Sequence, residues 1–476
     1  MGRFGKALLL AAVALPFAAT SAYAQNDEVS AGETEAAASE KRLGSVVVKA
    51  RKRDENLQEV PVVVQAFDAD ALRDYATSDF SDLSDLVSGL SIVADGPVSP
   101  SINLRGIQTS AASSVSDNAV SVVVDGVSYS SAQIFNFGLF DLEAMEVLKG
   151  PQALYFGKNS PGGVVAVRTQ NPTDEFYTEL QAGYEFEGER VYGHGIVSGP
   201  ISENWGGRLG VRVAAQDGYF NNIWGQGDPT EDQPFDLTGP DYDEYMLIGT
   251  LQGEFNRGSL TLKAIHANRE GGLYTQGQII QCNTLNRNEF SDCTLDKNFS
   301  TAPFVPNQGV APSVVTSGDE PFYEYELTQL TADGELELNE NWSLNSVTGY
   351  VEIENAFLGN VGPRSLSISS GLGFGSRPSV RTISEELRLT GEFDRFNVTL
   401  GAFVDDRDIS SFSKLWLTPT FALTPVLEFS VDARSWSLFA QADYDVTDTL
   451  SVSLGGRYTD EERETAGRNL QAGVRG

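Results

Sequence analysis

Apolar and polar residues alternate with a period of two along most of the chain after Phe176. In the first such stretch the even positions are mainly apolar (Phe176, Leu180, Ala182, Tyr184, Phe186), and the odd positions are polar (Glu179, Gln181, Glu185, Glu187). The pattern recurs at 208–216, 383–393 and 436–445. Because successive side chains of a β-strand point to opposite faces, each stretch predicts a strand with one apolar and one polar face. Strands of this kind are typical of β-barrels that span a membrane.

The connections between these strands are alternately short and long, apart from a short one at Gly188. Short turns fall near 198–205, 256–258, 339–341, 394–395 and 447–449, and long loops fall near 217–241, 269–320, 355–377 and 406–432. This order predicts one barrel rim with loops and one with tight turns, as in bacterial outer-membrane barrels. A water-soluble β-sandwich could share the alternation of residues but would not need loops on one side only.

The number of strands predicts that the barrel is half present. About eleven strands fit between residues 176 and 476, whereas plugged bacterial barrels close with about twenty-two. We therefore expect an N-terminal fragment with two unpaired strand edges, which are a folding liability. Such a chain by itself should neither insert into a membrane nor transport.

Three segments precede the barrel strands. Residues 1–24 read as a secretory signal peptide, with basic Arg3 and Lys6, an apolar run and an Ala22-Tyr23-Ala24 cleavage site. Residues 25–54 are polar and flexible in character, except for a short run of β-formers at 45–50. Residues 55–170 mix strand signals with apolar residues at helical spacing in 79–88, which predicts a small α+β domain.

Composition restricts the partners. The formal net charge is −33, so nucleic acid is a poor partner on electrostatic grounds. After the N-terminus, no apolar run is long enough for a membrane-spanning helix. A membrane protein of this composition would therefore have to be a closed barrel.

The stretch 142–172 reads LEAMEVLKGPQALYFGKNSPGGVVAVRTQNP. It resembles the end of the plug domain in TonB-dependent outer-membrane receptors of the siderophore-receptor type, where a similar series leads into the barrel. Two departures are a Lys149 where the family usually has Arg and an additional Phe156 before Gly157. A phosphate-binding loop is the alternative, but six residues separate Gly150 from Gly157 and Asn159 follows the lysine, so that motif does not fit.

The resemblance implies a β-class fold, with a plug inside an antiparallel transmembrane barrel, and an inner-membrane partner, TonB. Residues Val46, Val47, Val48, Lys49 and Ala50 resemble the TonB box, which joins that partner by strand addition; a first plug strand is the alternative. Arg105 and Lys149, with Glu146 as a nearby partner, would face carboxylates on the barrel wall and lock the plug.

The outward-facing segments of the plug would contact ligand by the same resemblance. These candidates are Gln108, Asp117, Asn118, Tyr129, Gln133, Phe135 and Asn136. Turns of small residues without ligand contact are the alternative, because Ser and Ala dominate the middle segment.

The rest of the chain offers little chemistry. Cys282 and Cys293 lie in one long loop of an exported protein, which predicts a local disulfide. Metal binding there is disfavoured because the loop holds no histidine. His194 and His266 lie on predicted strands as wall residues, and neither a nucleophile elbow nor a metalloprotease motif is present. No enzyme activity, metal or cofactor is expected.

The expected function is active uptake of a scarce nutrient across the outer membrane, in contact with its lipid. A ferric siderophore or related metal chelate leads, because it is the family's commonest cargo. Cobalamin, an oligosaccharide, an aromatic compound or a passive channel are alternatives. The loop 217–243 carries Asp228, Glu231, Asp232, Asp236, Asp241 and Asp243, which would slow anionic ligands, whereas Arg364, Arg377 and Arg381 act in the opposite direction.

Overall fold

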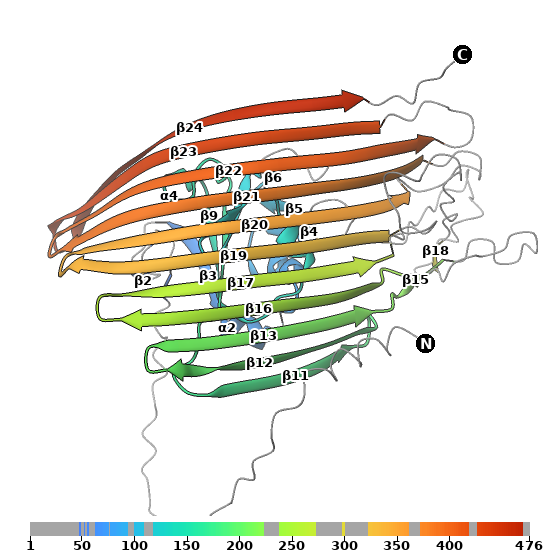
Figure 1. The fold of residues 1–476 in the computed structure, drawn as a ribbon, viewed down its shortest axis with the longest axis horizontal. Helices are drawn as coiled ribbons and strands as arrows, with labels where there is room; N and C mark the ends of the chain where they lie inside the picture. Colours follow the sequence, from blue (N-terminus) through green and yellow to red (C-terminus); the bar gives the residue numbers. More distant parts are fainter. Residues whose placement is uncertain are drawn as a thin grey trace, which may run out of the picture.

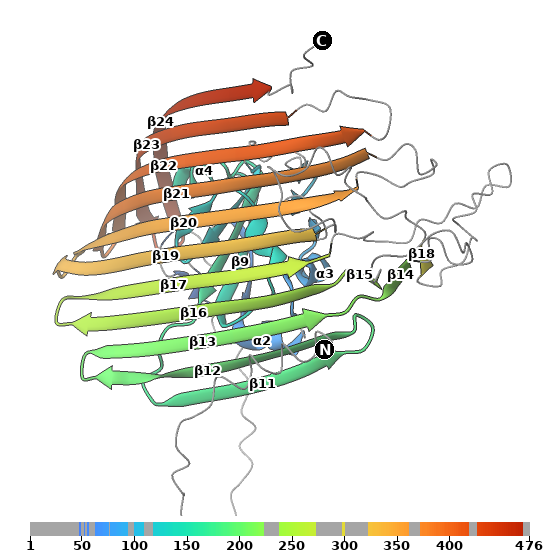
Figure 2. The ribbon, with the colours of Figure 1, turned by 45° about the vertical axis from the view of Figure 1, so that its right-hand side comes forward.

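The computed structural model describes residues 47–48, 52, 55–56, 62–75, 77–93, 100–108, 118–222, 238–272, 298–299, 322–360, 372–417 and 426–469. They form two main bodies. A large curved sheet, here called the wall, surrounds one side of a smaller domain, here called the inner domain (residues 62–170). Figure 1 and Figure 2 show the inner domain on the concave side of the wall.

The wall contains eleven antiparallel strands, each paired with the next along the chain. They are β11 (Tyr177–Glu185), β12 (Arg190–Ser202), β13 (Trp205–Gln216), β16 (Tyr242–Phe255), β17 (Gly258–Gly271), β19 (Phe322–Asn339), β20 (Trp342–Asn360), β21 (Leu372–Phe393), β22 (Phe396–Leu417), β23 (Val426–Thr447) and β24 (Leu450–Asn469). Within the described part of the chain, β11 and β24 are the two edges and the sheet is open. The predicted fold class, a barrel-type antiparallel sheet with a small α+β domain, is confirmed.

Two-residue turns join five pairs of wall strands, and all of them lie at one rim (Figure 1). The opposite rim carries the longer connections, as the sequence predicts. Three short strands form a separate sheet there: β14 (Phe220–Asn222), β15 (Thr238–Gly239) and β18 (Asn298–Phe299). The strands β20 to β23 extend further than expected into the predicted loops 355–377 and 406–432. Ile409 and Val431, which lie in the second of these segments, are buried together with Val380 and stabilise the added length there.

The alternating residues of the wall strands face outward and inward in turn. Leu209, Leu251 and Ile383 on the outer face are 51%, 45% and 53% exposed, whereas their inward-facing neighbours Arg208 and Thr250 are buried. The outward side is therefore a continuous apolar surface, and the inward side presents polar groups to the inner domain.

The inner domain is built on a five-stranded sheet in the order β3-β9-β10-β7-β8, in which only the β10–β7 pair is parallel. These strands are β3 (Val63–Asp68), β7 (Val120–Val124), β8 (Val127–Tyr129), β9 (Leu142–Lys149) and β10 (Gly163–Thr169). A second sheet contains β4 (Leu90–Val93), β5 (Ser101–Leu104) and β6 (Ile107–Gln108). The helical elements are α2 (Ala69–Asp74), η1 (Phe80–Asp82), α3 (Leu83–Leu86), η2 (Gln133–Asn136) and α4 (Ala153–Phe156).

The stretch that the sequence singled out, 142–172, supplies the centre of this domain. It forms β9, α4 and β10. The strands β9 and β10 pair antiparallel inside the five-stranded sheet. Gly163 needs to be glycine, because its φ is +145° and an added Cβ would lie 2.2 Å from the Leu148 carbonyl oxygen. The glycine pair after Pro161 thus permits the close approach of β10 to β9.

One hydrophobic core joins the inner domain to part of the wall. Inner-domain residues such as Val122, Phe135 and Met145 share a cluster with wall residues such as Ile248 and Leu327. The wall residues of this cluster lie on β12, β13, β16, β17, β19 and β20. The inner domain is therefore seated by apolar burial against the first half of the wall.

Candidate functional site

A cavity of about 670 Å³, here called the rim cavity, lies between the inner domain and the wall at the rim of the longer connections. The inner domain contributes η1, α3, η2 and the residues before η1, and the wall contributes the loop-side ends of β11 to β19. Seven tyrosines line it: Tyr75, Tyr184, Tyr192, Tyr219, Tyr242, Tyr323 and Tyr325. Its charged lining residues are Asp79, Asp82, Asp85, Glu185, Arg190 and Arg269. Aromatic faces with a few polar groups are typical of small-molecule sites.

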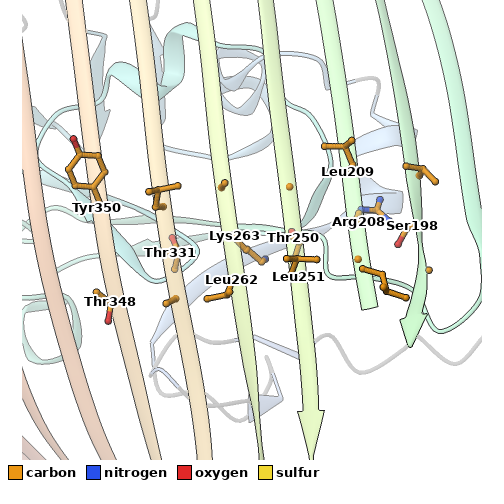
Figure 3. A pocket seen from close by; sticks show the side chains of 18 of the residues that line it. Ser198, Arg208, Leu209, Thr250, Leu251, Leu262, Lys263, Thr331, Thr348 and Tyr350 are labelled. Carbon is orange, nitrogen blue, oxygen red and sulfur yellow. The ribbon is translucent and has the colours of Figure 1, made fainter. Parts of the chain in front are cut away.

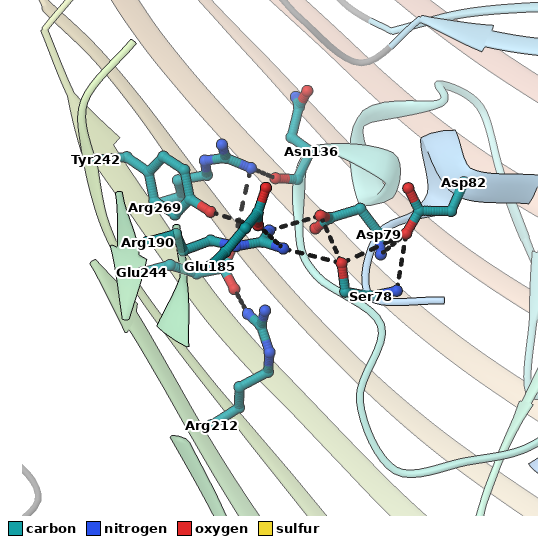
Figure 4. Close-up of polar contacts among 10 residues, drawn as sticks. All are labelled: Ser78, Asp79, Asp82, Asn136, Glu185, Arg190, Arg212, Tyr242, Glu244 and Arg269. Carbon is teal, nitrogen blue, oxygen red and sulfur yellow. Dashed lines mark hydrogen bonds and ion pairs between the residues drawn. The ribbon is translucent and has the colours of Figure 1, made fainter. Parts of the chain in front are cut away.

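Arg190 on β12 holds the inner domain to the wall beside the rim cavity (Figure 4). Its guanidinium donates to the Asp79 carboxylate at 2.6 Å and to the Ser78 hydroxyl at 2.9 Å. It also pairs with Glu185 of β11 at 2.7 Å. The Asp82 carboxylate accepts the backbone N–H groups of Ser78 and Asp79 at 2.8 and 3.0 Å, so the cap of η1 fixes the position at which Asp79 meets Arg190.

This contact determines the charge state of Asp79. Burial alone would raise the pKa of its carboxyl group, but the positive charge of Arg190, with Arg212 and Arg269 further away, outweighs burial and lowers that pKa below its usual value. Asp79 is therefore an anion at neutral pH, paired with the wall.

A second group of contacts surrounds Arg269 of β17 (Figure 4). Its guanidinium lies 3.6 Å from the centre of the Tyr242 ring and donates to the Asn136 backbone carbonyl. Glu244 pairs with Arg212 and lies 3.8 Å from Arg269. A Cβ on Gly138 would lie 2.3 Å from an Arg212 nitrogen, so a larger residue at this position would have to displace the Arg212 guanidinium. The cation–π contact and the ion pairs lie within the wall and position Arg269, and the hydrogen bond from Arg269 to Asn136 holds η2 against the wall.

The side chain of Asn136 lines the rim cavity without using its own donor. It is 2% exposed, and among the described residues its amide nitrogen has no hydrogen-bond partner. Unsatisfied buried donors are rare because they lose their water without compensation. A ligand oxygen in the cavity would satisfy this group.

Further ion pairs join the inner domain to the wall away from the cavity. On the β12–β17 side the acids come from the inner domain: Asp141 accepts Arg208 Nε at 2.9 Å, and Asp125 pairs with Lys263 at 3.0 Å. On the β21–β24 side the signs are reversed. Lys52 lies 3.5 Å from Glu386, and Lys158 lies 2.5 Å from Glu461.

The predicted lock of Arg105, Glu146 and Lys149 is not what holds the inner domain. Lys149 donates to Gln65 and to the Ser88 carbonyl, and Glu146 pairs with Arg168 of the adjacent strand, so both act within the inner domain. Arg105 is exposed in the β5–β6 turn, with φ of +53°. Among the described residues, neither Arg105 nor Lys149 forms an ion pair with a wall carboxylate, and the basic partners on the β12–β17 side belong to the wall.

The seven predicted ligand contacts separate into different places. Phe135 and Asn136 line the rim cavity. Tyr129 is buried and donates to Gln329 of the wall, and Gln133 is buried in η2. Gln108 is exposed at the end of β6, Asn118 is half-buried just before β7, and Asp117 lies outside the described residues.

The other predicted sites are described only in part. Val46, Lys49 and Ala50 of the coupling segment, and Cys282 and Cys293, lie outside the described residues. Val47–Val48 forms a short strand, β1, which pairs with β2 (Glu55–Asn56) of the same chain. A pairing within the same chain is what the alternative interpretation of this segment, a first plug strand, predicts.

The cavity residues that sequence reasoning missed are mostly on the wall. Arg190, Tyr242 and Arg269 are inward-facing residues near the loop-side ends of their strands. Polar or aromatic residues on the inward face next to a long loop were the available signal. Asp79 begins the stretch of helical spacing at 79–88, but its partner is 111 positions away in the sequence.

A shallow apolar hollow lies on the outward side of the wall (Figure 3). Leu209, Leu251 and Leu262 line it and are well exposed, whereas Arg208 and Lys263 of the same strands pair with the inner domain. The hollow therefore belongs to the apolar face and lacks the polar groups of a specific site.

No helix in the described part of the chain is long and apolar enough to cross a membrane. Within the same residues, no three His, Cys, Asp or Glu side chains are grouped as metal ligands.

Comparison with known proteins decides the family. The family model of the TonB-dependent receptor plug domain matches residues 56–164, and that of the TonB-dependent receptor-like β-barrel matches residues 283–475. The chain belongs to the TonB-dependent receptor family. The inner domain is thus its plug, and the wall is part of its barrel. The family consists of outer-membrane receptors and transporters rather than enzymes.

Relatives in sequence and in structure agree with this assignment. The chain is 29% identical over 127 residues to a probable TonB-dependent receptor of Bordetella pertussis, covering 27% of this chain and 16% of that protein. It is 34% identical over 105 residues to the pesticin receptor of Yersinia pestis, covering 22% of this chain and 15% of that protein.

Solved structures show the same fold. The ferric yersiniabactin uptake receptor of Yersinia pestis superposes with a TM-score of 0.65 at 16% identity, covering 86% of this chain and 58% of that chain. The pyoverdine outer membrane receptor of Pseudomonas aeruginosa gives 0.63 at 16% identity, covering 89% and 60%. The chain therefore spans somewhat more than half the length of these receptors.

Proposed function

We propose that this chain acts in an outer-membrane receptor that captures a ferric siderophore or related iron chelate and passes it inward with energy from TonB. The rim cavity carries the proposal. It opens between plug and barrel at the loop rim, it is lined by tyrosines, and its lining includes Asn136, whose amide nitrogen has no hydrogen-bond partner among the described residues. The siderophore receptors among the structural relatives support this ligand class.

In this arrangement of plug and wall, capture of the ligand and its release are separate steps. A ligand in the rim cavity touches η1, α3 and η2, which are the plug elements that Arg190 and Arg269 hold to the wall. Pulling on the plug would have to break these contacts before the ligand could pass. The outer membrane has no ATP, so we propose that residues 46–50 transmit the force from TonB, as the resemblance of this segment implies.

The outward face fits a position in the outer membrane. Its exposed leucines and isoleucines form the surface that lipid would cover, while the charged residues point to the plug. We propose that residues 1–24 direct the chain out of the cytoplasm.

Uptake of a radiolabelled ferric siderophore tests the function in cells that express the full-length natural protein. Deletion of residues 46–50 should abolish uptake but leave binding at the cell surface intact, because capture needs only the rim cavity. Deletion of five residues in the polar segment 30–34 is the matched control and should leave uptake unchanged. Uptake that survives the first deletion would instead favour a passive channel.

A further inference from the structure

The charges around the rim cavity are unequal. Three arginines, Arg190, Arg212 and Arg269, lie in or behind its lining, and all three are paired with carboxylates. Among the described residues, the lining itself carries four carboxylates, Asp79, Asp82, Asp85 and Glu185, but only two guanidinium groups, Arg190 and Arg269. The cavity region therefore has a formal excess of two negative charges.

The excess negative charge lies on residues of the rim cavity that a ligand would contact. Asp85 is exposed on α3 and lines the cavity, and Asp82 lines it beside the η1 cap. Across the described ranges, neither carboxylate forms an ion pair with Lys, Arg or His, whereas the guanidinium groups are held by Asp79, Glu185 and Glu244. An incoming anion would thus meet negative charge without a free cation to receive it.

The uncharged lining specifies other features of the ligand. Tyr75 lines the cavity and is 62% exposed, so its ring is open to stacking. Asn136 offers a buried N–H donor without a partner among the described residues. An amide donor recognises a neutral acceptor oxygen without requiring negative charge on the ligand.

We infer that the rim cavity selects an aryl-bearing iron chelate of zero or positive net charge that presents an acceptor oxygen to Asn136, and that it discriminates against polyanionic chelates. This inference rests on the proposed function and narrows its ligand class. The selectivity is electrostatic and arises from Asp82 and Asp85, whereas Asn136 and the tyrosines provide affinity.

Two chelates of similar size test the inference with the purified full-length natural protein in detergent at low ionic strength. One is a hexadentate ferric tris(aryl hydroxamate), which is neutral, and the other is a hexadentate ferric tris(catecholate), which carries three negative charges. We expect the neutral complex to bind at least about tenfold more tightly, and the difference to shrink when salt screens the field. Equal or tighter binding of the trianion would overturn the inference and leave the proposed function standing.

Single substitutions assign the effect to residues. Asp85→Asn should raise the affinity for the trianion about three- to tenfold and hardly change that for the neutral complex. Asp70→Asn, which removes an exposed carboxylate on α2 outside the cavity, is the matched control and should change neither. Asn136→Ala should weaken binding of the neutral complex about tenfold, with unchanged exchange protection of β9 as the check on folding.

Each remaining outcome also decides the question. An Asp85→Asn variant that behaves as Asp70→Asn would refute the electrostatic selectivity, and an Asn136→Ala variant with unchanged affinity would refute the hydrogen bond to the ligand. If neither chelate binds the unmodified full-length protein, both the inference and the proposed iron-chelate function fail.

Discussion

The Asp125–Lys263 contact allows a substitution that changes charge but not backbone geometry. Asp125 and Gly126 form the two-residue turn between β7 and β8, with φ of +48° and +82°, as a type I′ hairpin requires. Asn tolerates the left-handed conformation as well as Asp does. Asp125→Asn therefore removes the negative charge and retains the turn.

The expected loss follows from what the carboxylate holds. It accepts the Thr169 N–H at 2.9 Å, the Thr169 hydroxyl at 2.8 Å and the Lys263 ammonium at 3.0 Å. Both charged side chains are buried, 6% and 8% exposed, so Lys263 would be left without its counter-ion. Because breaking a buried charged pair is destabilising, we expect the free energy of opening this part of the plug to decrease by about 2–4 kcal/mol.

Hydrogen exchange measures this loss locally. The backbone N–H of Asp125 bonds to Val167 and that of Thr169 to the Asp125 carboxylate, so peptides covering β7, β8 and β10 report directly. The expected loss corresponds to about 30- to 1,000-fold faster exchange. Asp70→Asn is the control, because its ion pair with Arg73 is exposed and contributes little.

Two results would refute this reasoning. Exchange in β10 that is the same in Asp125→Asn and Asp70→Asn would mean that the pair does not seat the plug. A double variant with Lys263→Met should recover part of the protection, because it removes the unpaired buried charge. No recovery would show that the effect of Asp125→Asn comes from something other than the pair.

Two further predictions concern the rim. Because Arg190 lowers the folded-state pKa of Asp79 below its ordinary value of 3.8, the stability from this contact is fully present above that pH and is lost as pH falls through the folded-state pKa. Hydrogen exchange of residues 77–86 should therefore not depend on the Asp79 carboxyl group from neutral pH to about 4, and an added acid-dependent step should appear only below that pH. The Asp79→Asn variant should lack this step. If the wild type loosened between pH 7 and 5 and Asp79→Asn abolished that loosening, the prediction would be contradicted. Gly138→Ala should displace Arg212 and loosen η2 by about 1–3 kcal/mol, whereas Gly249→Ala, where an added Cβ meets nothing within 4 Å, should be neutral in the same exchange measurement.

The ion pairs between plug and wall have opposite signs on the two sides of the plug, and they involve residues other than the predicted lock of Arg105, Glu146 and Lys149. Arg105 and Lys149 attracted attention as basic residues in an apolar region, and burial does require such groups to be satisfied. Lys149 is satisfied within the plug by Gln65 and Ser88. A sequence shows that a charge needs a partner, but a partner can come from any segment that folding brings near.

The local pattern, in contrast, was sufficient for the architecture. The period of two predicted the wall strands and their apolar outer face, and the series from Glu146 to Gly163 indicated the plug and its junction with the barrel. These features depend on properties of a few consecutive residues, such as the alternation of side chains and the left-handed conformation at glycine. Such properties are already present in the unfolded chain.

The site was decided only by the tertiary structure. Asp79 and Arg190 are 111 residues apart, and the tyrosines of the rim cavity come from both the plug and the wall. Their meeting depends on the register of eleven strands and on the shared apolar core that seats the plug against β12 to β20. The sequence by itself determined which strands form and which of their faces is apolar, because backbone geometry is local. Which charges meet across the plug and the wall is a property of packing, because Coulomb and hydrogen-bond contacts act over a few ångströms in space regardless of distance along the chain.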